Sequence, residues 1–156
     1  MSDLRELYQE VILDHSRQPR NFRRPEHANH EAKGDNPLCG DKVTVFLTIE
    51  DGKVADVGFQ GRGCAISMAS ASLMTELIKG KTEDEVRALF ESFHGEMTGK
   101  SACHGAAAGE LDKLTVLSGV REYPMRVKCA TLSWHTLMAA LDNRQKGVST
   151  ENEDRL

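Results

Sequence analysis

The sequence predicts a small α+β protein, because segments with helical periodicity flank a segment with the alternation of an antiparallel β-hairpin. Branched apolar residues and leucine occupy every second position from Val43 to Ile49, as in a strand with one buried face. Asp51-Gly52 is a favoured hairpin turn, and residues 54–60 supply the returning strand. With a short edge strand expected near His30–Lys33, the antiparallel sheet has about three strands.

Two helices are expected on either side of these strands. Apolar residues spaced three and four apart predict the first helix over residues 4–15. An irregular segment follows over residues 16–38, where three prolines interrupt regular structure. The second helix is expected over residues 65–79, closed by Gly80. Its many alanines and serines should allow it to pack closely on the sheet.

Two further helices complete the predicted element order. Thr82 and Glu85 form a capping box that opens a helix with its apolar side chains turned inward. Residues 95–109 contain four glycines and four alanines, so a loop is expected there. The last helix is expected from about Met125 to Leu141, and the polar residues 143–156 are expected to form a flexible C-terminal tail.

Length and charge exclude several classes of protein. A chain of 156 residues is typical of one domain, which we assign to residues 1–142. Twenty basic and 24 acidic residues give a net charge of −4, which argues against a general nucleic-acid-binding protein. No stretch of 18 apolar residues and no signal-peptide pattern is present, so we expect no membrane association and a cytoplasmic location.

The four cysteines, Cys39, Cys64, Cys103 and Cys129, are the most informative residues. Structural disulfides are rare in a reducing compartment, so each thiol is expected to be buried, reactive or bound to a metal. Cys39 and Asp41 are two residues apart where a strand begins, so their side chains can converge. Cys64 precedes a helix and Cys129 lies near the start of another, and helix N-termini favour the thiolate form.

Three thiolates and one carboxylate form a possible tetrahedral ligand set for zinc. From spacing alone this interpretation is weak, because the chain has no pair of cysteines separated by two residues. Separate buried cysteines therefore remain the alternative at this stage.

Three motifs occur together and in order. They are Asn36-Pro37-Leu38-Cys39-Gly40-Asp41, Gly61-Arg62-Gly63-Cys64-Ala65-Ile66-Ser67 followed by Ala69-Ser70-Ala71-Ser72, and Arg126-Val127-Lys128-Cys129. Together they resemble the iron–sulfur scaffold superfamily of the IscU and NifU N-terminal type, and most closely its SufU branch. The resemblance extends from about Leu4 to Leu141 and implies a small antiparallel sheet with helices packed mainly on one face.

Two features favour the SufU branch within this family. Lys128 stands where scaffold-type IscU members carry a histidine, and the stretch between Cys64 and Cys129 is longer than theirs. The resemblance implies a zinc-containing, persulfide-accepting sulfurtransferase that works with a PLP-dependent, SufS-like cysteine desulfurase and with downstream iron–sulfur assembly proteins. Its zinc ligands would be Cys39, Asp41, Cys64 and Cys129, with Cys39 as the catalytic sulfur acceptor.

Two other functions remain open at this stage. The same four residues could hold an iron ion or a 2Fe–2S cluster on a scaffold that assembles the cluster and transfers it, or the zinc could be purely structural. Cys103-His104 matches no family motif, so Cys103 is taken as an ordinary cysteine. The arginines between Arg17 and Arg24 are taken as a solvated loop or as a docking patch for an acidic partner.

Overall fold

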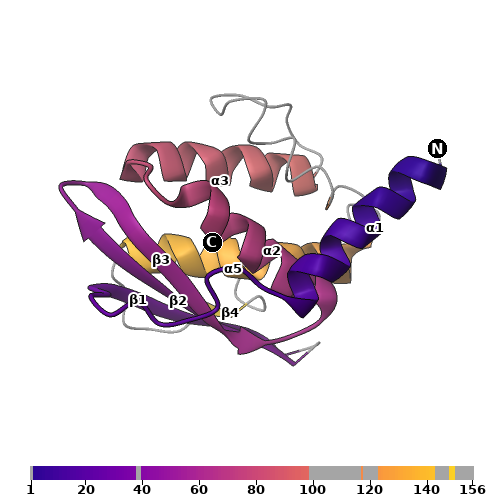
Figure 1. Cartoon of the computed structure of the whole chain (residues 1–156), viewed down its shortest axis with the longest axis horizontal. Coiled ribbons are helices and arrows are strands. Elements are labelled where there is room, and N and C mark those ends of the chain that lie inside the picture. The colour runs from indigo at the N-terminus through magenta and orange to yellow at the C-terminus, as the bar shows by residue number, and fades with distance from the viewer. Residues whose placement is uncertain (1, 38–39, 99–116, 118–122, 143–147, 150–156) are drawn as a thin grey trace.

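The α+β class is confirmed by a computed structural model, which describes residues 2–37, 40–98, 117, 123–142 and 148–149 (Figure 1). Its elements, in chain order, are α1 (Ser2–Arg17), β1 (His30–Asn36), β2 (Asp41–Glu50), β3 (Lys53–Arg62), α2 (Ala65–Ile78), α3 (Glu83–Thr98), α5 (Pro124–Leu141) and β4 (Val148–Ser149). Each helix and strand expected within the described residues is present.

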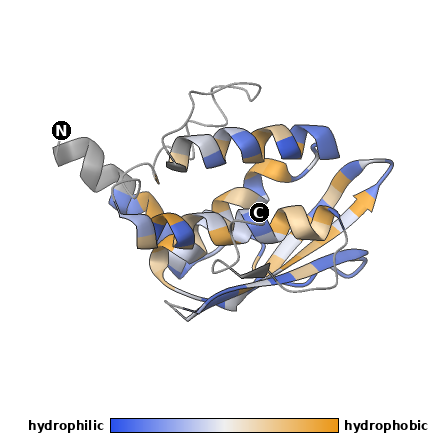
Figure 2. Cartoon of the chain, turned by 180° about the vertical axis from the view of Figure 1, so that it is seen from behind, coloured by the Kyte–Doolittle hydropathy of each residue, from blue (hydrophilic) through white to orange (hydrophobic). Residues whose placement is uncertain are grey.

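The sheet has the order β3-β2-β1-β4. The three longer strands pair antiparallel, as predicted, and Val45 of β2 lies between Ala32 of β1 and Phe59 of β3. Asp51 and Gly52 both have positive φ, as the tight hairpin turn requires. Figure 2 shows hydrophilic residues at this turn and apolar stretches along the strands.

The fourth strand was not expected. Val148–Ser149 pairs in parallel with β1, Val148 opposite Gly34. These two residues belong to the segment predicted to be a flexible tail, and the rest of residues 143–156 lies outside the described part of the chain. The flexibility of the tail as a whole stays a prediction.

The helices cover one face of the sheet, as the family resemblance implies (Figure 1). α5 packs on β1 and β2, while α2 lies between α1 and α5 and also contacts β3. α3 packs on the far side of α5. The shared core includes fully buried Leu47, Phe59, Met74, Trp134 and Leu137. Within the described residues, no helix is both long enough and apolar enough to cross a membrane.

The irregular segment between α1 and β1 covers the edge of β3 and part of the opposite face of the sheet. The carbonyl oxygen of Asn21 accepts from the amide of Phe59 at 3.0 Å, so the segment follows the free edge of β3. Phe46 points away from the helices because it alternates with Val45 and Leu47. The Arg24 guanidinium lies 5.5 Å from the centre of its ring, and Phe46 is only 4% exposed.

The arginine cluster makes ion pairs within the chain itself. Arg20 contacts Asp14 at 2.6 Å, Arg23 contacts Asp56 at 2.8 Å, and Arg24 lies 4.0 Å from Glu31. These side chains are partly exposed, so each pair contributes little to stability. The prediction that this cluster docks an acidic partner is not tested by these contacts.

The small side chains of α2 fix its distance from both neighbouring helices. Ser70 Oγ donates to the carbonyl of Ala130 in α5 and accepts from Trp134 Nε1 at 3.1 Å. On the other side, Ser72 Oγ lies 2.7 Å from Nδ1 of His15 in α1. The close approach predicted from the alanines and serines is therefore made chiefly to helices, with β3 as a further contact.

α3 begins as predicted and ends later than predicted. Thr82 Oγ1 accepts from the Glu85 amide at 3.2 Å, and Glu85 Oε1 accepts from the Thr82 amide at 2.9 Å, which confirms the capping box. The loop expected from Gly95 is wrong for residues 95–98, because the helix continues to Thr98. Met97 is fully buried one turn after Phe93, and this burial offsets the low helix propensity of glycine.

The buried His135 on α5 predicts a loss of stability in mild acid. Its ring lies 5.3 Å from the rings of both Phe90 and His94, centre to centre. Burial, with His94 nearby, lowers its pKa from 6.5 to about 4. The unfolded chain takes up this proton first, so stability falls as the pH drops from about 6.5 towards 4, by roughly 3 kcal/mol over the whole window.

Urea unfolding of the metal-free protein near pH 7 and near pH 5 measures this loss. The His135→Phe variant keeps an aromatic ring in the same packing and lacks the titrating group, so its stability should change less between the two conditions. An equal loss in both proteins would contradict the assignment.

Candidate metal centre

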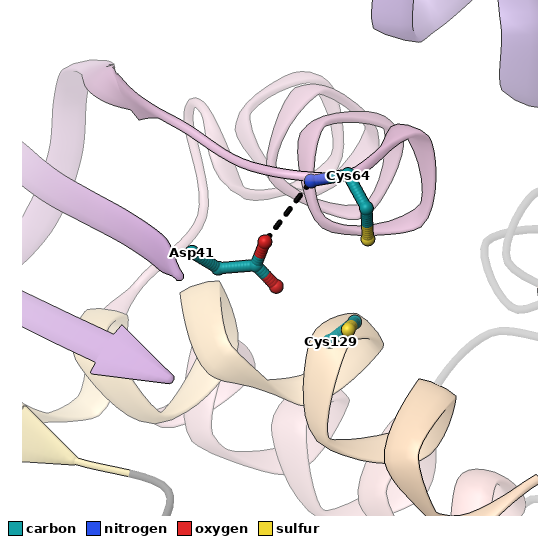
Figure 3. A group of neighbouring side chains, drawn as sticks. All are labelled: Asp41, Cys64 and Cys129. Atoms are coloured by element: carbon teal, nitrogen blue, oxygen red, sulfur yellow. Dashed lines mark hydrogen bonds between the residues drawn. The ribbon is translucent and has the colours of Figure 1, made fainter. Parts of the chain in front are cut away.

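Three predicted ligand residues meet at one end of the sheet. Asp41 is the first residue of β2, Cys64 immediately precedes α2, and Cys129 lies in the second turn of α5 (Figure 3). One carboxylate oxygen and the two Sγ atoms all lie within 4.8 Å of one another. Cys39 and Cys103 lie outside the described residues, so the structure does not test either assignment.

Strand register brings these elements together. Asn36 pairs with Asp41 at the end of the β1–β2 ladder, and Lys42 pairs with Arg62, the last residue of β3. The chain therefore leaves the sheet beside Asp41 and reaches Cys64 within two residues. Gly40 has a φ of +75°, and its amide donates to the Asn36 carbonyl at 2.8 Å, which closes the turn before Asp41.

The carboxylate of Asp41 is buried, and only one of its two oxygens accepts a hydrogen bond within the described part of the chain. Oδ1 accepts from the Cys64 amide at 3.0 Å, whereas Oδ2 has no hydrogen-bond partner among the described residues. Asp41 is 1% exposed. Burying a carboxylate oxygen without a partner costs several kcal/mol in general, and a cation removes that cost. This orphaned oxygen beside two sulfurs fits a bound metal ion.

The two thiols differ in protonation. Cys64 is the N-cap of α2, and its Sγ accepts from the Ser67 amide at 3.5 Å. Its pKa is lowered to about 6, mainly by the hydrogen bond from Cys129 and against the effect of burial. The thiolate predicted for Cys64 is therefore favoured near neutral pH.

The same expectation is wrong for Cys129 in the metal-free protein. Its pKa is raised, first by the hydrogen bond to Cys64, then by burial, and also by Asp41. Three negative charges on two sulfurs and a carboxylate this close together would repel one another strongly. Cys129 therefore keeps its proton. The Arg126 guanidinium interacts with both thiols, which raise its own pKa.

Asn36 is a further residue of this centre, and the motifs alone assign it no role. Its side chain is fully buried, and Nδ2 donates to Cys129 Sγ at 3.8 Å. The available signal was its place at the start of the Asn36–Asp41 motif, directly before Pro37. The sequence does not show which way the Asn36 side chain points. Its orientation depends on the pairing of Asn36 with Asp41 in the sheet.

Gly63 provides a direct test of how Asp41 is held. A Cβ atom at this position would lie 2.7 Å from Asp41 Oδ1 and 3.1 Å from Ser67 Oγ. The Gly63→Ala variant must therefore displace the carboxylate, and we expect its zinc affinity to fall roughly tenfold or more, as when a supporting contact of a metal ligand is lost. Competition with a chromophoric chelator measures the affinity, and an unchanged value would count against Asp41 as a metal ligand.

Comparisons with known proteins identify the family of this chain. The family model for the NifU-like N-terminal domain matches residues 7–130. The zinc-dependent sulfurtransferase SufU of Bacillus subtilis is 37% identical over 150 residues, which cover 96% of this chain and 95% of that protein. The iron–sulfur cluster assembly scaffold protein IscU of Streptococcus pyogenes is 35% identical over 141 residues, covering 90% and 86%.

A solved structure shares the fold. The crystal structure of a putative SUF-system scaffold protein, SufU from Fervidobacterium islandicum, superposes with a TM-score of 0.76 at 37% identity. The match covers 85% of this chain and 94% of that one. The family match spans most of the chain and includes all three residues of the centre, and the resemblance found in the motifs is confirmed. The chain belongs to the family of NifU-like N-terminal domains.

Proposed function

We propose that this protein is a zinc-dependent sulfurtransferase of iron–sulfur cluster assembly, which accepts persulfide sulfur from a PLP-dependent cysteine desulfurase. The observation that carries the proposal is the cluster of Asp41, Cys64 and Cys129, in which a buried carboxylate oxygen lacks a partner. The name of the Bacillus subtilis relative, a zinc-dependent sulfurtransferase, supports the same assignment.

Cys39 is the proposed fourth ligand. It is two residues from Asp41 in the sequence, a separation short enough for both side chains to bind one metal ion. Three sulfurs and one oxygen complete the four-coordinate set that zinc prefers. Bound zinc would keep these thiols deprotonated without oxidising them, because it has no accessible redox chemistry.

The proposed sulfur transfer is a thiolate–persulfide exchange at Cys39. The Cys39 thiolate attacks the terminal sulfur of the persulfide on the desulfurase cysteine. A sulfur–sulfur bond forms on Cys39 as the bond to the desulfurase cysteine breaks, and that cysteine leaves as a thiolate. The exchange needs no external oxidant, since one persulfide is consumed for each one formed.

A scaffold that assembles a 2Fe–2S cluster on the same residues is the second candidate. The Streptococcus pyogenes relative is named a scaffold protein, and its identity to this chain is close to that of the sulfurtransferase. Lys128, in place of the histidine of scaffold-type members, favours sulfur transfer. Downstream iron–sulfur assembly proteins would receive sulfur in the first case and a finished cluster in the second.

One experiment separates the two candidates. The purified protein is assayed for zinc and iron, and cysteine turnover by a cognate desulfurase is measured with wild type, Cys39→Ala and the control Cys103→Ala. We expect one zinc ion per chain, stimulation by wild type and by Cys103→Ala, and none by Cys39→Ala. An iron-loaded protein that passes a cluster to an apo-acceptor without affecting turnover would instead establish the scaffold.

A further inference from the structure

We infer that Asn36 is a positioning residue of the metal centre, whose side-chain N–H group donates to Cys129 Sγ and directs that sulfur towards the metal. The inference rests on the metal site of the proposed function, and it adds a residue that is not itself a ligand. It does not depend on whether the metal serves sulfur transfer or cluster assembly.

The placement of Asn36 is tightly determined. It is the last residue of β1, it is 0% exposed, and it pairs with Asp41 at the end of the β1–β2 ladder. Its own carbonyl accepts from the Gly40 amide at 2.8 Å. The backbone is thus held on both sides, and the buried amide reaches α5, where Nδ2 lies 3.8 Å from Cys129 Sγ.

The end of the β1–β2 pair therefore contacts both helices that carry a cysteine, α2 and α5. It does so through two residues that pair with each other, Asn36 and Asp41. Asp41 accepts from the backbone amide of Cys64 at 3.0 Å, and Asn36 donates to the sulfur of Cys129. One residue fixes the start of α2 and the other fixes a ligand atom on α5. Supporting contacts of this kind orient metal ligands, and their loss typically costs 10- to 100-fold in metal affinity.

A neutral donor suits this position. Cys129 Sγ already has the Cys64 sulfur and the Asp41 carboxylate as neighbours, both of which carry negative charge when they bind a metal. A third charged group would alter the charge balance of the centre, whereas an amide N–H stabilises electron density on the sulfur without changing its net charge.

Replacing zinc with cobalt allows the hydrogen bond from Asn36 to Cys129 Sγ to be detected by absorption spectroscopy. Co²⁺ bound to thiolates absorbs in the near ultraviolet by sulfur-to-metal charge transfer, and an N–H donor to the sulfur moves this band to higher energy. Asn36→Leu keeps the number and branching of the side-chain heavy atoms and removes the donor, and Asn36→Ala removes the donor and most of the side chain. Both variants should bind zinc 10- to 100-fold more weakly and shift the cobalt band to lower energy.

Asn29→Leu is the matched control. Asn29 bonds the backbone of Ile49 with both side-chain atoms, at 2.9 Å each, at the opposite end of the same strands. This variant should lose stability and keep the wild-type cobalt spectrum and zinc affinity. A purely structural role of Asn36 would leave the cobalt band unmoved, as in this control, whatever happens to the zinc affinity, and would overturn the inference.

The unaltered protein gives an independent measurement should the variants fold poorly. With a spin-half cadmium isotope in the site, an N–H···S hydrogen bond transmits a scalar coupling between the metal and the Asn36 amide proton. Folded, cadmium-bound wild type without this coupling would refute the inference. Wild type with no thiolate-to-metal band at all would refute the metal centre itself, and with it the proposed function.

Discussion

The zinc dissociation constant of the Cys129→Ser variant is expected to rise roughly a hundredfold to a thousandfold. Structural zinc sites bind with roughly 10–16 kcal/mol spread over four ligands, so one lost thiolate costs roughly 3 kcal/mol. Cys129 is fully buried on α5, and a serine there cannot supply an equivalent thiolate. Competition against a chromophoric chelator measures the constant.

The same substitution should reduce the stabilisation that zinc gives to the fold. Saturating zinc stabilises the native state in proportion to the logarithm of its affinity, so the variant should gain roughly 3–4 kcal/mol less than wild type on zinc addition. Cys103→Ser is the matched control, because no motif assigns that cysteine to the ligand set. Equal zinc affinity in Cys129→Ser and wild type would remove Cys129 from the centre.

The secondary structure was predictable where burial and local hydrogen bonds act together. The alternation from Val43 to Ile49 identifies a strand because one side of β2 packs on the helices. Thr82 and Glu85 identify a helix start because each side chain bonds the backbone amide of the other. The last turn of α3 was missed because Gly95 disfavours helix locally, while the burial of Met97 depends on tertiary packing.

The residues of the proposed metal centre could be named from motifs, whereas their electrostatics could not. The motifs contain Asp41, Cys64 and Cys129, but the sequence does not give their separation. That separation follows from two pairs of residues, Asn36 with Asp41 and Lys42 with Arg62. Helix position alone predicts a thiolate at Cys129, and the hydrogen bond to Cys64, together with burial and the nearby Asp41, reverses this expectation by raising its pKa.

The two oxygens of Asp41 can be tested separately, because one holds Cys64 and the other faces the site. In Asp41→Asn the amide oxygen can still accept from the Cys64 amide, and the opposite atom becomes an NH₂ group that cannot bind a metal. We expect its zinc affinity to fall roughly a hundredfold, while the metal-free protein stays about as stable as wild type. Chelator competition and urea unfolding without metal measure the two quantities.

Asp41→Ala removes both oxygens and should differ from Asp41→Asn in the metal-free state. The Cys64 amide loses its acceptor at the start of α2, which costs roughly 1–3 kcal/mol for a donor left unpaired in a partly buried site. Zinc affinity should fall at least as far as in Asp41→Asn. If instead Asp41→Asn binds zinc as wild type does and only Asp41→Ala weakens, Asp41 supports Cys64 without binding the metal. The fourth ligand must then come from elsewhere in the chain or from a partner.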